Sequence, residues 1–158
     1  MENENGRKIK LLVLWDILYK NTDENHAMNA DEIRDELAKR GVSVIRRVVA
    51  NDIATLNEYG YEVLSYKKKY TYYYIVNRPL ETAEVVMLAD VVKASKLSVA
   101  QKKSLIEKLS DTLCSYQAEN ISKNIISFAK SSKGNSSLIY NVDAIECAIN
   151  DNKKISFV

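Results

Sequence analysis

The 158-residue sequence is poor in the residue types on which most enzyme and metal sites depend, with one histidine, two cysteines and four glycines. His26 lies in a polar stretch with no obvious partner, and none of the glycines is arranged as a phosphate-binding loop. Cys114 and Cys147 are too few and too far apart for a disulfide framework or a zinc ribbon, so we expect plain thiols in a reducing cytosol. These absences argue against an enzyme, and we expect neither a cofactor nor a metal.

Long apolar runs are also missing from the sequence. The longest, LLVLW at residues 11–15, is far too short to span a membrane, and the N-terminal MENENGRKIK lacks the apolar core of a signal peptide. The composition, 46% hydrophobic and 28% charged, is that of a folded chain rather than a disordered one. A cytoplasmic protein without a membrane segment is the simplest interpretation.

The only proline, Pro79, separates two parts of different character. Before it, apolar residues recur at three- and four-residue steps over residues 7–20, which predicts an amphipathic helix. The segment MNADEIRDELAKRG predicts a second helix, because Asn29 is placed to cap its N-terminus, acidic residues fill its first turn and Gly41 follows its last turn.

A third helix is predicted over residues 43–59, after a turn of only three residues, with Ser43 as its cap and Gly60 as its terminator. The β-prone runs YEVLSY and YTYYYIV then predict a hairpin over residues 61–76, whose glycine-free turn favours a loop longer than two residues. This order of three helices and a hairpin is that of a winged helix-turn-helix. In such a fold the third helix lies in the DNA major groove and the hairpin forms the wing beside it.

Beyond Pro79 the sequence becomes almost wholly helical, with apolar stripes at helical spacing in three successive segments. The stripes consist of Val85, Leu88, Ala89 and Val92, then Leu105, Ile106, Leu109 and Leu113, and then Ile121, Ile125 and Phe128. SSKGNSS at residues 131–137 has the composition of a linker, and LIYNVDAIECAIN after it predicts one more helix.

The chain ends in KKISFV, which predicts the opening of a strand. Because the backbone groups of a strand need a partner, we expect the chain to stop just inside a further domain; the alternative is that KKISFV joins a sheet elsewhere. We therefore expect a mainly α, α+β fold in three segments. Residues 1–78 form the winged helix-turn-helix, 79–137 a helical linker or dimerisation segment, and 138–158 the start of a truncated C-terminal domain.

A helical wheel divides the predicted third helix into two faces. Ile45, Val49, Ile53 and Leu56 share the stripe that we expect to be buried. The opposite side collects Ser43, Arg47, Ala50, Asn51 and Ala54, with Arg46 on the flank.

This exposed face suits the readout of DNA bases, because its small alanines let the helix approach closely. Arg47 can offer a bidentate fork to guanine, and Asn51 can pair with adenine through a donor and an acceptor. Ser43 and the helix N-terminus can hold a phosphate, and Arg46 can reach another. The alternative is that both arginines are ordinary solvated residues.

The hairpin places Lys67, Lys68 and Lys69 near its tip, where they can neutralise phosphates or enter the minor groove. Between residues 41 and 78, six Lys and Arg stand against three Asp and Glu, a net charge of +3. Strand alternation points Tyr73 and Ile75 to one face and Tyr70, Tyr72 and Tyr74 to the other. Cross-strand packing explains most of the tyrosines, whereas Tyr70 is placed to bond a phosphate.

The segment VSVIRRVVANDIATLNEYGYEV resembles the recognition helix of winged-helix regulators that carry a C-terminal WYL sensor domain, sometimes grouped as DeoR-like. Their pattern is similar to S-x-R-T-V-x-R-D-I-x-x-L-x-x-x-G. It is matched at Arg47, Val49, Asp52, Ile53, Leu56 and Gly60, and departs at Val48, Ala50 and Asn51. AIECAINDNKKISFV resembles the entry into the WYL domain, and the tripeptide itself is absent.

The resemblance implies a bacterial transcription regulator that binds double-stranded DNA and whose C-terminal domain senses an effector ligand. We expect it to work as a homodimer through the helices between Thr82 and Lys130, which would set two recognition helices about one DNA turn apart. The alternative for those apolar stripes is a core within one chain. The alternative function is a winged-helix adaptor that binds protein and never contacts DNA.

Overall fold

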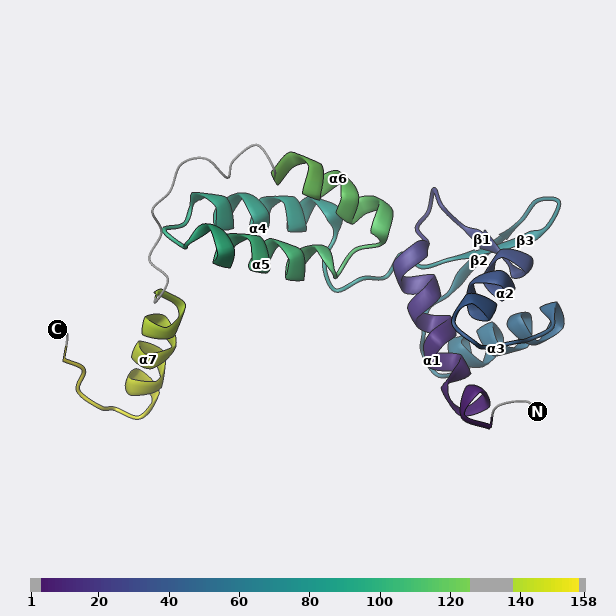
Figure 1. Cartoon of the computed structure of the whole chain (residues 1–158), viewed down its shortest axis with the longest axis horizontal. Helices are drawn as coiled ribbons and strands as arrows, with labels where there is room; N and C mark the ends of the chain where they lie inside the picture. Colours follow the sequence, from purple (N-terminus) through teal and green to yellow (C-terminus); the bar gives the residue numbers. More distant parts are fainter. Residues whose placement is uncertain (1–3, 126–137, 157–158) are drawn as a thin grey trace.

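The computed structural model describes residues 4–125 and 138–156, and these form a mainly helical chain with one small antiparallel sheet (Figure 1). The α+β class expected from the sequence is confirmed. The helices are α1 (Glu4–Asn21), α2 (Ala30–Lys39), α3 (Arg46–Glu58), α4 (Thr82–Ala94), α5 (Val99–Ser110), α6 (Ser115–Ile125) and α7 (Leu138–Asn150). The strands are β1 (Met28–Asn29), β2 (Leu64–Lys67) and β3 (Thr71–Tyr74). Among these described residues, no helix is long and apolar enough to cross a membrane.

The sheet has the strand order β1-β3-β2, with both neighbouring pairs antiparallel. The hairpin of β2 and β3 was predicted, and its loop of three residues is longer than a two-residue turn, as expected. β1 was not predicted, because two residues are too short to show any alternation. Its second residue, Asn29, has two roles, since it also caps α2 through a capping box with Glu32.

One hydrophobic core joins α1, α2, α3 and the sheet. Its buried members include Leu14 and Ile17 of α1, Ile33 and Leu37 of α2, Val49, Ile53 and Leu56 of α3, and Val63 and Ile75 beside the strands. The predicted inner stripe of α3 is therefore confirmed at three of its four positions. Ile45 is the exception, with 68% of its surface exposed, because the helix starts only after it.

The start of α3 differs from the prediction. Ile45, and not Ser43, is the N-cap, and it makes no side-chain capping hydrogen bond. Six residues rather than three separate α2 from α3, and within this connection Val42 is buried and Val44 packs against the core. The predicted terminators are confirmed: Gly41 and Gly60 adopt φ values of +79° and +87°, which L side chains rarely adopt.

A second, smaller core lies between α4, α5 and α6. It buries Val85, Ala89, Ile106, Leu113 and Ile121, so most of the predicted stripes do form a core within one chain. Leu88 is an exception and remains 41% exposed. The second predicted stripe, from Leu105 to Leu113, does not lie on one helix: α5 ends at Ser110, and Leu113 and Cys114 are buried in the connection to α6.

The C-terminal helix α7 has the bounds predicted for it. None of its residues whose side chains are described belongs to either core, and Figure 1 shows the helix apart from the others. Residues 153–156 pair with no strand among the described residues, so the strand opening expected there, with its partner in a further domain, stays a prediction. The predicted linker and Phe128 lie outside the described residues.

Candidate nucleic-acid interface

The solvent face of α3 carries four of the five residues predicted for it, and the fifth, Ser43, lies before the helix. Arg47, Ala50, Asn51 and Ala54 are all exposed, opposite the buried stripe of Val49, Ile53 and Leu56. The helix itself is anchored on its inner side, where Lys10 of α1 forms an ion pair with Asp52 at 2.8 Å, both side chains being largely buried. α3 is thus fixed to the core while its small and hydrogen-bonding side chains face outwards.

Arg46, the first residue of α3, connects three elements. Its guanidinium lies 3.6 Å from the Asp31 carboxylate at the start of α2 and 5.5 Å from the centre of the Tyr70 ring in the hairpin loop. The side chain is about half exposed, at 53%. The contact with Tyr70 brings the N-terminus of α3 and the hairpin loop together on one side of the molecule.

The hairpin loop holds the lysines that the sequence placed at the tip. Lys67 is the last residue of β2, and Lys68, Lys69 and Tyr70 form the loop, which the Lys68 amide closes by donating to the Tyr70 carbonyl at 2.9 Å. The Lys69 ammonium lies 5.5 Å from the Tyr70 ring centre, and all four residues are exposed. The Tyr70 ring therefore contacts both Arg46 and Lys69, and these residues with the adjoining Lys67 and Lys68 are a cluster of positive charge, the basic surface.

Asn57 sets the hairpin against α3, a role that sequence reasoning missed. Its side-chain amide donates to the Val63 carbonyl at 3.1 Å, and its side-chain oxygen accepts from the Val63 amide at 2.8 Å. Both backbone groups at the start of the hairpin are thus held by one side chain of α3. An Asn seven positions before an extended run is too weak a pattern to predict such a bond.

The tyrosines of the two strands divide as strand alternation predicted, but Tyr70, expected on the face of Tyr72 and Tyr74, lies in the loop beside Arg46. Tyr73 packs against the core and Ile75 is fully buried. On the outer face Tyr66 and Tyr72 stack across the strands, with ring centres 5.4 Å apart and planes at 16°, and Tyr74 contacts Tyr66 at 5.9 Å. Cross-strand packing therefore accounts for these rings, as expected, and Tyr70 remains apart from them beside Arg46.

Two residues do not contribute to this surface as the sequence suggested. Ser43 is exposed but lies in the connection before α3, so it is not at the helix N-terminus. Arg78, counted among the local positive charges, is directed inwards, where its Nη2 donates to the carbonyls of Tyr19 at 2.7 Å and Thr22 at 2.9 Å. It stacks over the Tyr19 ring and closes the C-terminus of α1.

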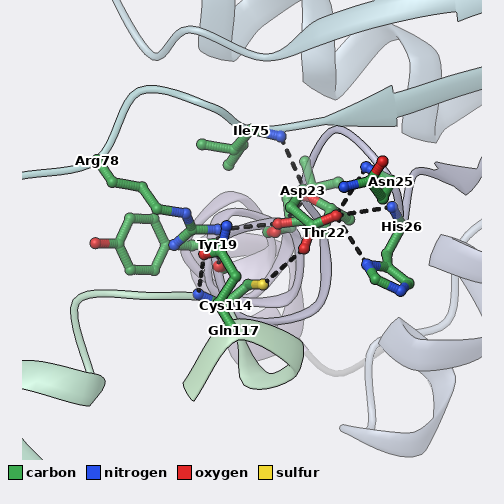
Figure 2. Close-up of polar contacts among 10 residues, drawn as sticks. Tyr19, Thr22, Asp23, Asn25, His26, Ile75, Arg78, Cys114 and Gln117 are labelled. Atoms are coloured by element: carbon green, nitrogen blue, oxygen red, sulfur yellow. Dashed lines mark hydrogen bonds and ion pairs between the residues drawn. The ribbon is translucent and has the colours of Figure 1, made fainter. Parts of the chain in front are cut away.

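Arg78 belongs to a polar junction between the N-terminal core and the helices beyond Pro79 (Figure 2). Tyr19 donates to the Thr112 carbonyl at 2.9 Å, and the Cys114 thiol donates to the Asp23 carboxylate at 3.1 Å. Burial alone would raise the pKa of Asp23, but hydrogen bonds from Cys114, from His26 and from two backbone amides outweigh it and hold that pKa below its ordinary value.

The pKa of the buried Cys114 thiol also departs from its ordinary value. Burial raises the pKa of Cys114, and the neighbouring Asp23 carboxylate adds to the effect, so the sulfur stays protonated and acts as a donor. His26, expected to have no partner, has two, because Nδ1 lies 2.8 Å from Asp23 and the ring stacks on Tyr116 at 3.9 Å. In the part of the chain that the structure describes, no cluster of His, Cys, Asp or Glu is arranged to hold a metal.

Comparison with known protein families, with characterised proteins and with solved structures finds no match to this chain.

Proposed function

We propose that residues 1–78 are a winged helix-turn-helix that binds double-stranded DNA by sequence, and that the protein is a transcription regulator. The observation that carries the proposal is the contact of Arg46 with Tyr70, which joins the exposed face of α3 to the lysines of the hairpin loop. The chain order α1-β1-α2-α3-β2-β3 supports it, as does the resemblance of residues 42–63 to WYL-linked regulators.

In this proposal α3 enters the major groove with its exposed face. Ala50 and Ala54 leave room for the groove floor, Arg47 pairs with the O6 and N7 acceptors of a guanine, and Asn51 pairs with the N6 and N7 of an adenine. The anchoring of α3 through Lys10 and Asp52 limits the entropy lost on binding, because the helix is already fixed.

The hairpin is then the wing that contacts the flanking backbone. Lys67, Lys68 and Lys69 are exposed near its tip, and each phosphate they neutralise releases a counterion. Arg46 is also within the same surface, where a phosphate can replace its weak, exposed pairing with Asp31.

The test is to select bound sequences from a random duplex pool and to titrate the selected duplex. Replacing Arg47 and Asn51 by Ala together should weaken binding at least tenfold, because each base contact contributes about 1–3 kcal/mol. A control, Lys103→Ala with Asn120→Ala, also removes one positive charge and one side-chain amide, from exposed positions on α5 and α6, and should leave affinity unchanged.

The salt dependence of the same titration separates the two parts of the surface. Replacing the three lysines by Ala should reduce the slope of log K against log salt by about 0.9 for each phosphate that is no longer neutralised, while sequence preference stays. Equal affinity for all duplexes in wild type and in the Arg47 and Asn51 variant would contradict sequence readout by α3. The absence of binding to any duplex, even at low salt, would favour the adaptor alternative.

We also propose that the regulator is a homodimer, with the outer face of α4 as its seam. The internal core uses Val85 and Ala89, which leaves an exposed stripe of Ala83, Met87, Val91 and Ala94 on the other side of α4. Met87 and Val91 are 69% and 68% exposed, and a two-fold axis across the helix would set Ala83 of one copy against Ala94 of the other.

A change of mass in solution tests the seam. Light scattering should give twice the chain mass for wild type, and Met87→Glu with Val91→Glu should reduce it to one chain mass, because two buried carboxylates per copy would face each other. The Lys103 and Asn120 control should remain dimeric. A wild-type protein that stays monomeric at high concentration would contradict the seam.

A further inference from the structure

The outer face of the hairpin carries an aromatic surface that the proposed duplex site does not use. Tyr66 of β2 and Tyr72 and Tyr74 of β3 lie on this face and form a tyrosine ladder. All three rings are half-buried, and none belongs to the hydrophobic core. Leu64 and Val76, 37% and 41% exposed, extend the same face towards the base of the hairpin. The ladder therefore leaves aromatic and aliphatic surface in contact with solvent.

The spacing along β3 determines which form of nucleic acid fits the ladder. Side chains two residues apart on a strand, such as Tyr72 and Tyr74, are separated by about 6.8 Å. Bases within a duplex are stacked about 3.4 Å apart and cover each other's faces. Only an extended strand with unstacked bases can place successive bases on both rings.

The charge around the ladder suits a phosphate backbone. The Lys68 ammonium lies 5.1 Å from the centre of the Tyr66 ring, so a positive charge stands at the edge of the ladder. Residues 63–80 contain three Lys and one Arg and no Asp or Glu, and of these Arg78 is directed inwards. A strand lying on the ladder would meet lysines and no carboxylate from this segment.

We propose that the tyrosine ladder binds the unpaired bases of a single-stranded nucleic acid, with Lys68 and its neighbours holding the phosphates. Stacking on aromatic rings tolerates any base, so this site has little sequence preference, in contrast to α3. The proposal does not depend on base readout by Arg47 and Asn51, because those residues lie on another element and the ladder faces away from the core that α3 packs on.

The experiment measures the fluorescence anisotropy of labelled (dT)20 and (rU)20 with the full chain. Wild type should bind at low salt, and Tyr66→Leu with Tyr72→Leu should bind at least tenfold more weakly. Tyr66→Phe with Tyr72→Phe keeps both rings and should bind within twofold of wild type. As a control, Tyr59→Leu with Tyr140→Leu removes two rings outside the hairpin that are 79% and 74% exposed. This variant should bind both labelled strands with the affinity of wild type.

Photochemical cross-linking of a 5-iodouracil strand makes the test independent of any variant that fails to fold. The expected products carry the strand on Tyr66, Tyr72 or Tyr74. Binding by only one of the two strands supports the site and identifies its ligand as DNA or RNA. The absence of binding at low salt, cross-links confined to other residues, or equal affinity of the folded Leu variant and wild type would overturn the proposal.

The Arg47→Ala, Asn51→Ala protein separates this site from the duplex site. It should bind both single strands like wild type. If the ladder results hold and that variant still binds duplex normally, the proposed readout by α3 fails alone; if duplex readout holds and the Leu variant binds single strands normally, the ladder fails alone.

Discussion

At the scale of single residues, two asparagines of α3 differ in what their side chains contact. Asn57 makes two hydrogen bonds to the backbone of Val63, whereas Asn51 faces solvent. Asn57→Ala should lower the free energy of unfolding by about 1–3 kcal/mol, because two backbone groups lose their partner. Asn51→Ala should change it by less than about 0.5 kcal/mol. Urea unfolding of both variants measures the difference.

The same pair separates stability from recognition. Asn51→Ala should weaken binding to the selected duplex directly. Asn57→Ala should affect binding only indirectly, through a change in the position of the hairpin relative to α3. If Asn57→Ala proves as stable as Asn51→Ala, the Asn57 side chain does not hold the hairpin.

At the scale of elements, α3 begins without a side-chain cap. Ile45 stands at the N-cap with extended φ and ψ and is 68% exposed, so its side chain contributes little burial. Ile45→Ser should raise the free energy of unfolding by about 1 kcal/mol, because a serine oxygen can accept from an amide of the first turn.

Ser43→Ala is the matched control for this change. Since Ser43 lies in the connection before α3, its replacement should leave thermal stability unaltered. If Ser43→Ala instead lowers the free energy of unfolding by about 1 kcal/mol, the loss expected for a missing cap, Ser43 would be the N-cap of α3 and Ile45 would not.

The elements that the sequence predicted well are those with strong periodicity or caps. As expected, Asn29 caps the start of α2, Gly41 follows the end of α2 and Gly60 follows the end of α3. The helix α7 has its predicted ends. The errors occur where tertiary contacts decide. β1 exists only through its pairing with β3, and the break between α5 and α6 places Cys114 against Asp23, 91 residues away.

The candidate site follows the same division. The exposed face of α3 and the lysines of the hairpin could be predicted from helical and strand periodicity, since both depend on local sequence. Periodicity could not predict that Arg46 contacts Tyr70 or that Arg78 is directed inwards, because each depends on how distant segments pack.

At the scale of the whole molecule, Asp23 joins the N-terminal core to the helices beyond Pro79. Its pKa lies below the ordinary value near 3.8, so its ionised form stabilises the fold above that pH. This stability should disappear as the pH falls below about 4 and the carboxylate takes up a proton. Asp23→Asn should be less stable than wild type at pH 7, and the difference should shrink towards pH 2.

Unfolding at a series of pH values measures this effect, with Glu107→Gln on the outside of α5 as control. A constant difference between wild type and Asp23→Asn from pH 7 to pH 2 would mean that the charge of Asp23 does not support the junction.

The most direct measurement is to map backbone amide chemical shifts while the selected duplex is added. If α3 lies in the major groove and the hairpin is the wing, amides of residues 46–54 and 67–70 should shift most, and those of α5 and α6 should not. Tight duplex binding that leaves the amides of α3 unchanged would contradict the central claim.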